Sequence, residues 1–510
     1  MATDRHHLRR FVAGAAFLLL APIATLSAAA RPDGQLEIRV VDSETSEPLA
    51  ARIHLRDARQ RPVRTRGLGV AAHGDHFYVD GSTLLGLRRG QYTFDLDAGW
   101  ERRTRAGHFE IDRRSEDTKE VEVSRFANLV SENWHGADLD ADRSLTDLSV
   151  VLRAEQLAYL PLTEWRADDE QWKQASRTAA STRDLPSAIG LHAARLETAG
   201  GDLLFFRPGK LIDPTELPSP GRVTIDALQS ARDAGYRIVA ADLTAWDLPV
   251  WLAAGVLDAV CLIDRTSGYD RVETNSSTGR RRDTTFFPGK RGPGRWREAI
   301  YFQALNAGLQ LPAVAGSGSG DTDSPLGTNR VYAHCDVGFS PEAWWQAIDA
   351  GQTVVTNGPL LRPSVFGEPP GFEFRLDSAG SFSAPIALNL STRTKIDYLE
   401  LIQNGEAVVS VRLADWAAAG GKLPELDFNR SGWFAIRAVT TDEDRYQLAL
   451  SSPYYVSEAS NPRISRKSCQ FFFDWLDESA EQADVPDWRQ AELAKARNYW
   501  QTRLANANAP

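Results

Sequence analysis

The sequence is poor in cysteine, with only Cys261, Cys335 and Cys469, which lie far apart. Because the number is odd, at least one thiol is unpaired. The chain has no C-x-x-C pair and no Cys/His cluster, which argues against a cysteine-held zinc site or a thiol redox site. An exported protein of this length does not need disulfides, so the low count is compatible with secretion.

Basic residues are also in the minority. Lys and Arg number 58 against 68 Asp and Glu, which gives a net charge of -10. Nucleic-acid binding needs clustered Lys and Arg. The densest basic run, Arg280-Arg281-Arg282, is followed directly by Asp283 and is interpreted as a solvated loop. We therefore expect no nucleic-acid partner.

Long hydrophobic runs are absent except at the N-terminus. Phe11 to Leu26 is apolar, follows Arg9 and Arg10, and precedes the small residues Ser27 to Ala30. This order is typical of a signal peptide, so residues 1–30 are predicted to be removed and the protein exported to the periplasm or the extracellular space. No later stretch reaches the roughly 18 apolar residues of a membrane span, so no integral membrane segment is expected after cleavage.

Hydrophobic patterning divides the remaining chain into four parts. Residues 35–127 and 363–457 show the alternation of β-strands, and residues 465–510 are helical. Between them, in 130–362, short apolar strands alternate with helices, which favours a parallel sheet or barrel. The predicted fold class is therefore α/β, a β/α barrel flanked by two β-sandwiches and followed by a helical tail. Asn404-Gly405, between two apolar runs, predicts a two-residue type I′ hairpin.

Three carboxylates follow one another at alternate positions, at Asp138, Asp140 and Asp142. On an extended strand all three side chains point to one face. Such a cluster of like charges must be neutralised by water, a cation or basic partners. At the mouth of a barrel, this is where enzymes of that architecture keep their chemistry.

Several segments carry a resemblance to known families. In the first sandwich, Leu87 to Tyr92 is similar to a turn of transthyretin-like or carboxypeptidase-regulatory-like domains. In the middle part the segments are Gly136 to Leu139, Arg153 to Leu157, Asp247 to Ala253, Gly294 to Tyr301, Ala315 to Ser317, Asn329 to His334 and Thr356 to Leu360. Together these resemble the carbaryl-hydrolase-like branch of the PHP metallohydrolases. The resemblance implies a distorted β/α barrel and an ancestry of metal-dependent ester, amide or phosphoester hydrolysis.

The sequence departs from that family at its metal ligands. Two histidines of the family motif are replaced by Asp140 and Asp142, and a Glu-Lys pair after Asp242 is missing. A further Asn and His are replaced at Asp264 and Arg265. Since a binuclear zinc-type site needs nitrogen or sulfur ligands, the histidine site is predicted to be lost and zinc is not expected.

Two interpretations follow for the carboxylates. In the leading one, Arg143 or Arg265 neutralises them, because a guanidinium can replace a cation electrostatically. The protein would then be a non-catalytic ligand-binding or accessory protein without a cofactor, with a small-molecule or polymer ligand. The resemblance adds Asn329, Arg330 and Asn357 to the predicted ligand pocket.

In the alternative, the carboxylates hold a single Mg²⁺, Mn²⁺ or Ca²⁺ ion that activates water for hydrolysis. The predicted ligands are Asp138, Asp140, Asp142 and Asp264. His334 and Asp242 are then the predicted catalytic residues. A third hypothesis is a structural component of the cell envelope, which an exposed apolar patch on either sandwich would favour.

The run Gly316-Ser317-Gly318-Ser319-Gly320 formally fits a serine nucleophile elbow, with Ser319 at the nucleophile position. No histidine lies at a compelling position to act as its base. A turn at the mouth of the barrel is therefore the favoured interpretation.

Overall fold

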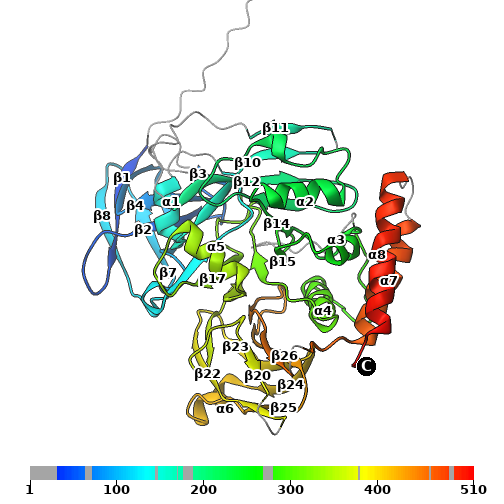
Figure 1. The fold of residues 1–510 in the computed structure, drawn as a ribbon. Helices are drawn as coiled ribbons and strands as arrows, with labels where there is room; N and C mark the ends of the chain where they lie inside the picture. Colours follow the sequence, from blue (N-terminus) through cyan, green and yellow to red (C-terminus); the bar gives the residue numbers. More distant parts are fainter. Residues whose placement is uncertain are drawn as a thin grey trace, which may run out of the picture.

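The computed structural model describes residues 32–63, 72–143, 148–168, 170–175, 188–267, 279–376, 380–458, 461–481 and 487–510 (Figure 1). The predicted signal peptide lies outside the described residues. Among the helices of the described part, none is long and apolar enough to cross a membrane.

The N-terminal part is an eight-stranded sheet with the order β7-β6-β2-β4-β5-β1-β8, and β3 pairs with β4. In β1, Leu36, Ile38 and Val40 are buried while Glu37 and Arg39 alternate with them, so one face of the strand enters a hydrophobic core. The strands are β1 (Gly34–Asp42), β2 (Ala50–Asp57), β3 (Ala72–His73), β4 (His76–Asp80), β5 (Ser82–Leu87), β6 (Gly90–Asp97), β7 (Arg105–Ile111) and β8 (Glu116–Val123).

The central part is built on a seven-stranded sheet with the order β11-β10-β12-β13-β14-β15-β16. Its strands are β10 (Leu160–Ala167), β11 (Trp172–Gln174), β12 (Ile189–Leu196), β13 (Leu203–Phe206), β14 (Arg237–Ala240), β15 (Ala259–Ile263) and β16 (Ala313–Ala315). The helices between and beside these strands are α1 (Leu148–Glu155), η3 (Pro214–Glu216), α2 (Ile225–Asp233), α3 (Leu248–Ala254), α4 (Gly292–Asn306) and α5 (Pro341–Asp349).

The predicted β/α barrel is wrong. In the described part of the chain strand exceeds helix, 39% against 22%, and no closed barrel of parallel strands is present there. β13 runs antiparallel to both β12 and β14, so the sheet is mixed. The reason is local: the loop 197–202 that joins β12 to β13 carries no helix, and parallel neighbours need a crossover of about a dozen residues.

The strands expected to complete the barrel belong to another sheet. β9 (Trp134–Ala137), preceded by η1 (Val130–Glu132), pairs with β17 (Arg330–His334), and β17 pairs with β18 (Thr353–Thr356). All three lie in a nine-stranded sheet that continues into the C-terminal sandwich. The remaining strands are β19 (Leu360–Val365), β20 (Glu373–Arg375), β21 (Phe382–Ala384), β22 (Ile386–Ser391), β23 (Ile396–Gln403), β24 (Glu406–Val411), β25 (Leu426–Phe428), β26 (Gly432–Thr440), β27 (Leu448–Ser451) and β28 (Tyr454–Ser457), with helix α6 (Leu413–Ala418).

The predicted hairpin at Asn404-Gly405 is confirmed. β23 and β24 pair antiparallel up to Gln403 and Glu406. Both turn residues have positive φ, 51° for Asn404 and 87° for Gly405, as a type I′ turn requires.

The C-terminal segment contains two helices, α7 (Arg466–Ala480) and α8 (Asp487–Ala505), which lie beside α3 and α4 (Figure 1). Phe472 of α7 stacks on Trp500 of α8, with ring centroids 4.8 Å apart. The Trp500 indole donates to the Pro249 carbonyl of α3 at 3.0 Å, so the tail is packed onto the central part. All three cysteines are buried free thiols.

Candidate functional site

The carboxylate-rich centre lies where several strands end. β14, β15 and β16 are parallel, so the segments that follow them, with Asp242, Asp264 and Gly316, meet at one edge of the sheet. The segment after β9 runs beside the third of these loops, since the Gly318 amide donates to the Asp140 carbonyl at 2.8 Å. Carboxyl ends of parallel strands are the usual place for ligand sites in such sheets.

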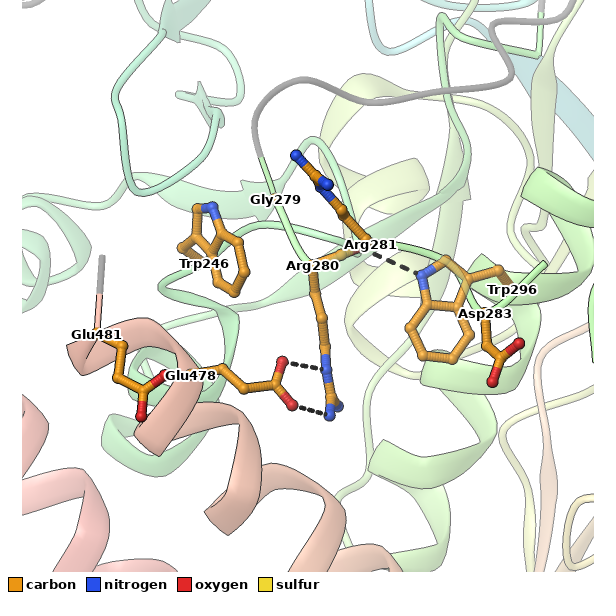
Figure 2. Close-up of a pocket in the computed structure, with 8 residues that line it drawn as sticks. All are labelled: Trp246, Gly279, Arg280, Arg281, Asp283, Trp296, Glu478 and Glu481. Carbon is orange, nitrogen blue, oxygen red and sulfur yellow. Dashed lines mark hydrogen bonds and ion pairs between the residues drawn. The ribbon is translucent and has the colours of Figure 1, made fainter. Parts of the chain in front are cut away.

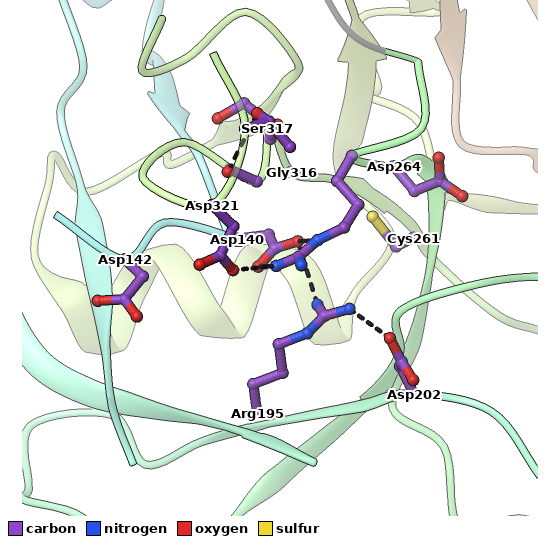
Figure 3. A network of polar contacts seen from close by, with 12 residues as sticks. Asp140, Asp142, Arg195, Asp202, Cys261, Asp264, Gly316, Ser317 and Asp321 are labelled. Carbon is purple, nitrogen blue, oxygen red and sulfur yellow. Dashed lines mark hydrogen bonds and ion pairs between the residues drawn. The ribbon is translucent and has the colours of Figure 1, made fainter. Parts of the chain in front are cut away.

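Asp140 is the hub of this centre (Figure 3). Its side chain accepts two hydrogen bonds from Arg265, at 2.8 and 2.9 Å, and a third from Arg195 at 3.2 Å. Burial acts to raise the pKa of Asp140, but the charges of Arg195 and Arg265 outweigh it and hold the pKa well below its usual range. Both carboxylate oxygens are therefore engaged by guanidinium groups.

The surrounding carboxylates are held in the same way. Arg265 also bonds Asp321 at 3.0 Å, and Arg195 bonds Asp202. Arg166 donates to Asp142 at 3.1 Å and also to Asp321. Three arginines from β10, β12 and the loop after β15 thus cross-link four carboxylates from three segments. Of these arginines, the sequence indicated only Arg265.

Asp138 lies in the same centre, but within the described residues its hydrogen bonds come from backbone amides and a serine hydroxyl, not from an arginine. It accepts hydrogen bonds from the amides of Ser317 at 2.9 Å, Gly327 at 2.8 Å and Asp140 at 3.1 Å, and from the Ser317 hydroxyl. Burial raises its pKa to about 6, and these donors limit the rise. The Ser319 hydroxyl accepts from Arg143 at 3.2 Å, and within the described residues neither serine hydroxyl has a hydrogen bond with a histidine.

The state of Asp138 gives a pH-dependent prediction. Its pKa is 3.8 in an exposed carboxyl and about 6 here, so between these values the folded protein holds a proton that the unfolded chain has lost. Lowering the pH from 7 to 4 should therefore raise the free energy of unfolding of the wild type relative to Asp138→Asn. A shift of about two units corresponds to about 3 kcal/mol. Urea denaturation of both proteins across this range measures it, and parallel pH profiles would contradict it.

A second buried pair lies beside the first. Arg297 of α4 is 2.6 Å from Asp264 and 3.6 Å from Asp242. Burial raises the pKa of Asp264, and the Arg297 charge opposes the rise. Asp242 in turn accepts from the Thr244 amide at 2.8 Å and its hydroxyl at 2.7 Å. Arg297 was not indicated by the sequence, because a helix face gives no sign of the distant carboxylate that it meets.

His334 does not join the centre. In the β9–β17 pair it lies opposite Trp134, whereas Asp138 follows the other end of β9. From Trp134 to Asp138 the chain advances four residues, which corresponds to about 13 Å along a strand. The His334 ring lies 5.1 Å from that of Trp134, and its Nδ1 atom is 3.2 Å from Asp336. The expected role of His334 as acid or base is not supported by this placement.

Three residues expected in the ligand pocket bind the backbone instead. Asn329 donates to the carbonyls of Asp264 and Gly316, at 2.8 and 3.1 Å, and so ties two loops of the centre together. The Arg330 guanidinium donates to carbonyls of neighbouring loops and lies 4.6 Å from the Trp100 ring centroid. Asn357 donates to the Tyr446 carbonyl at 3.2 Å. These contacts join neighbouring loops, and a ligand-binding role for the three residues stays a prediction.

A pocket of about 590 Å³ opens beside the centre (Figure 2). Its lining residues are Trp246, Gly279, Arg280, Arg281, Asp283, Trp296, Glu478 and Glu481. Arg280 pairs with Glu478 at 2.6 Å and lies over the Phe471 ring, so the expectation of a solvated basic loop is wrong for this residue. The Arg280 amide donates to the carbonyl of Thr244, which joins the pocket wall to the segment that holds Asp242.

A possible metal-binding group lies outside the predicted ligands. His54, Asp75 and His76 of the N-terminal sheet present ligand atoms within 4.8 Å of one another. The sequence led us to expect no cofactor or a single carboxylate-held cation, with no zinc, and this histidine group was not among the predicted ligands. Two imidazoles are donors that zinc accepts readily, so this group differs in chemistry as well as in position.

Comparisons with known proteins give no family. No family model matches the sequence, and no curated protein matches it. Two solved structures are similar over short parts: the pilus-presented adhesin Cpa and the fibronectin(III)-like modules of CbhA from Clostridium thermocellum. The first is 12% identical over 18% of this chain and 26% of the adhesin, with a TM-score of 0.13. The second is 12% identical over 26% of this chain and 62% of that one, with a TM-score of 0.14. Scores this low carry no argument about fold or function.

Proposed function

We propose that this protein is a non-catalytic ligand-binding or accessory protein that acts after export. The observation that carries the proposal is the state of Asp140, whose two oxygens accept three hydrogen bonds from Arg265 and Arg195. A cation would need those same oxygens. The guanidinium groups supply the positive charge that a metal would supply, without its open coordination positions.

The alternative of a hydrolase with a carboxylate-held cation receives less support. Of its four predicted ligands, Asp140 and Asp142 bond arginines, and Asp264 pairs with Arg297. Asp138 is saturated by backbone and serine donors. The resemblance to the carbaryl-hydrolase-like family stays a prediction about ancestry.

The ligand site that we propose is the pocket between Trp246 and Trp296. Both indoles are partly exposed, and Arg281 at the rim is exposed to solvent. Flat aromatic side chains with a nearby guanidinium suit a ligand with a flat apolar face and hydrogen-bonding or anionic groups, such as a sugar or an aromatic acid.

The pocket gives a direct binding prediction. A panel of soluble oligosaccharides and aromatic carboxylates is screened by thermal shift, and the affinity of any hit is measured by calorimetry. Trp246→Ala should weaken binding about 30-fold, the effect of losing about 2 kcal/mol at an aromatic contact. Trp416→Ala, in helix α6 of the C-terminal sandwich, is the matched control and should leave the affinity unchanged.

Turnover separates this proposal from the hydrolase. Hydrolysis of nitrophenyl esters and phosphoesters is compared between the wild type and Asp140→Asn in the presence of Mg²⁺, Mn²⁺ or Ca²⁺. We expect both proteins to be at the background rate. A cation-dependent rate in the wild type that Asp140→Asn abolishes would overturn the non-catalytic proposal.

The cell-envelope hypothesis rests on one feature of the C-terminal sandwich. Phe366 and Phe372 are 64% and 40% exposed, and both rings contact Phe374. Ordinary monomeric proteins carry exposed apolar patches of this size. The cell-envelope hypothesis therefore has less support than ligand binding in the pocket.

A further inference from the structure

Three histidines stand side by side on the N-terminal sheet. β3 and β4 are joined by a two-residue turn, Gly74-Asp75, so that His73 and His76 are directly opposite. β2 pairs with β4 through Ile53 and Phe77, and extending this register by one residue sets His54 opposite His76. Directly opposite residues share a face of the sheet, so all three imidazoles gather on one face.

This face is not the one that forms the sandwich core. Ile53 and Phe77 belong to the N-terminal core, whereas Tyr78, on the histidine side of β4, packs against helix α1. Arg52, on the same side of β2, donates to Glu155 at the end of α1 at 2.6 Å. The histidines therefore lie where the N-terminal sheet meets the central part.

The ligand atoms of His54, Asp75 and His76 are close together, whereas His73 also has a backbone hydrogen bond with Thr322. The Asp75 carboxylate lies 3.2 Å from Nδ1 of His54 and 3.2 Å from Nδ1 of His76. His76 is 3% exposed, and its Nε2 atom has no hydrogen-bond partner; the same holds for Nε2 of His73. The ring centroids of His73 and His76 are 5.7 Å apart. A buried, unpartnered imidazole nitrogen is costly unless it meets a ligand.

Burial and neighbouring charges both affect the three imidazoles. Burial lowers the pKa of all three. The positive charges that contribute are Arg52 and Arg143. Arg52 is paired with Asp97 and Glu155, and the Asp75 carboxylate adds a negative charge within the group.

We propose that His54, His73, His76 and Asp75 bind one Zn²⁺ ion. Three imidazoles and a carboxylate complete the four-coordinate set that zinc prefers, and a site closed by four protein ligands is structural. Tetrahedral ligands at bonds of about 2.0 Å lie about 3.3 Å apart, so side-chain rotation has to close about 1.5 Å from the 4.8 Å spacing of the His54, Asp75 and His76 ligand atoms. His73, which lies outside this group of three, has to rotate toward it as the fourth ligand. The half-exposed Asp75 leaves a path for the ion to enter.

The bound ion would fix the β3–β4 turn against the candidate site. Gly74 of this turn lies near the Asp323 carboxylate, because a Cβ added to Gly74 would be 3.9 Å from it. Asp323 follows the loop that carries Ser317 and Asp321. The proposed zinc site of the N-terminal sheet therefore lies next to the carboxylate centre. The inference does not depend on the proposed function.

The test uses the full-length protein, treated with a chelator and then titrated with Zn²⁺ and with Co²⁺. The wild type should bind one metal ion per chain, rise by several degrees in Tm, and show the visible absorption of tetrahedral Co²⁺. His76→Gln should weaken Zn²⁺ binding by more than about 100-fold, since even changing a residue that only hydrogen-bonds to a metal ligand costs about 10- to 100-fold. His73→Gln, at a half-buried position that places less demand on folding, should weaken it likewise.

Two control variants should keep the metal: His108→Gln, an exposed histidine of β7, and Asp140→Asn in the carboxylate centre. If Zn²⁺ and Co²⁺ leave the wild type without a shift or a spectrum, the histidines are a packed aromatic cluster with Tyr78 and the proposal is wrong. Retention of tight binding in both His73→Gln and His76→Gln would also refute it. Loss of binding in Asp140→Asn alone would move the metal to the carboxylate centre and overturn the assignment.

Discussion

Arg195→Met should lower the free energy of unfolding by about 3–5 kcal/mol, the usual cost of removing one partner from a buried charge pair. Arg195 is 4% exposed and bonds Asp140, Asp202 and Glu197, with 2.9 Å to the last. Methionine keeps the length of the apolar stem but leaves Asp140 with Arg265 alone. Urea denaturation of the two proteins at pH 7 measures the difference.

Arg237→Met is the matched control. Arg237 lies on β14 of the same sheet and pairs with Asp349 at 2.7 Å, but both side chains are about one third exposed. A pair of this exposure contributes up to about 1 kcal/mol. Similar small losses for both variants would mean that Arg195 does not neutralise the buried carboxylates.

Arg297→Met is expected to be comparably severe, with a loss of about 3–5 kcal/mol, because it leaves Asp264 charged and buried. Both side chains of this pair are almost fully buried, at 4% and 3% exposure. Asp264→Leu alone should also destabilise the protein, since Arg297 then keeps only the longer contact to Asp242. The double variant Arg297→Met/Asp264→Leu should recover most of the loss, because an apolar pair of similar volume replaces a buried ion pair at little cost.

The double-mutant cycle distinguishes the two interpretations of Asp264. If Asp264 serves only as the ion-pair partner of Arg297, the coupling energy between the two residues should be at least about 2 kcal/mol and the double variant should be well folded. A metal ligand predicts additive losses and a double variant that no longer responds to divalent cations. Denaturation curves of all four proteins, with and without EDTA, provide both readouts.

Part of this structure could be predicted from local sequence patterns. The hairpin at Asn404-Gly405 follows from two residues that tolerate positive φ, and the helices of the tail follow from the periodicity around Phe472. Both depend on residues close in sequence. The barrel prediction failed because a short buried strand such as Leu203–Phe206 shows no sign of its direction, which is set by the length of the connection before it.

Of the candidate site, the sequence predicted the carboxylates but not most of their arginine partners. The spacing of Asp138, Asp140 and Asp142 identified the carboxylates. Their partners Arg166 and Arg195 lie on β10 and β12, where single arginines among buried residues give no signal until the strands are placed in order. The histidine group could not be predicted from local sequence alone. The short turn between His73 and His76 is indicated by the sequence, but the position of His54 beside them depends on the β2–β4 register.

The most direct test of the central claim, that arginines occupy the place of a metal, is a thermal unfolding titration with Mg²⁺ and Ca²⁺. These hard cations prefer carboxylates over the imidazoles of the N-terminal sheet. The wild type should show no change in Tm, whereas Arg265→Ala should gain several degrees at millimolar cation, because it leaves Asp140 with Arg195 alone and Asp321 with Arg166 alone. Stabilisation of the wild type by either cation, lost in Asp140→Asn, would contradict the account and show that the carboxylates hold a metal.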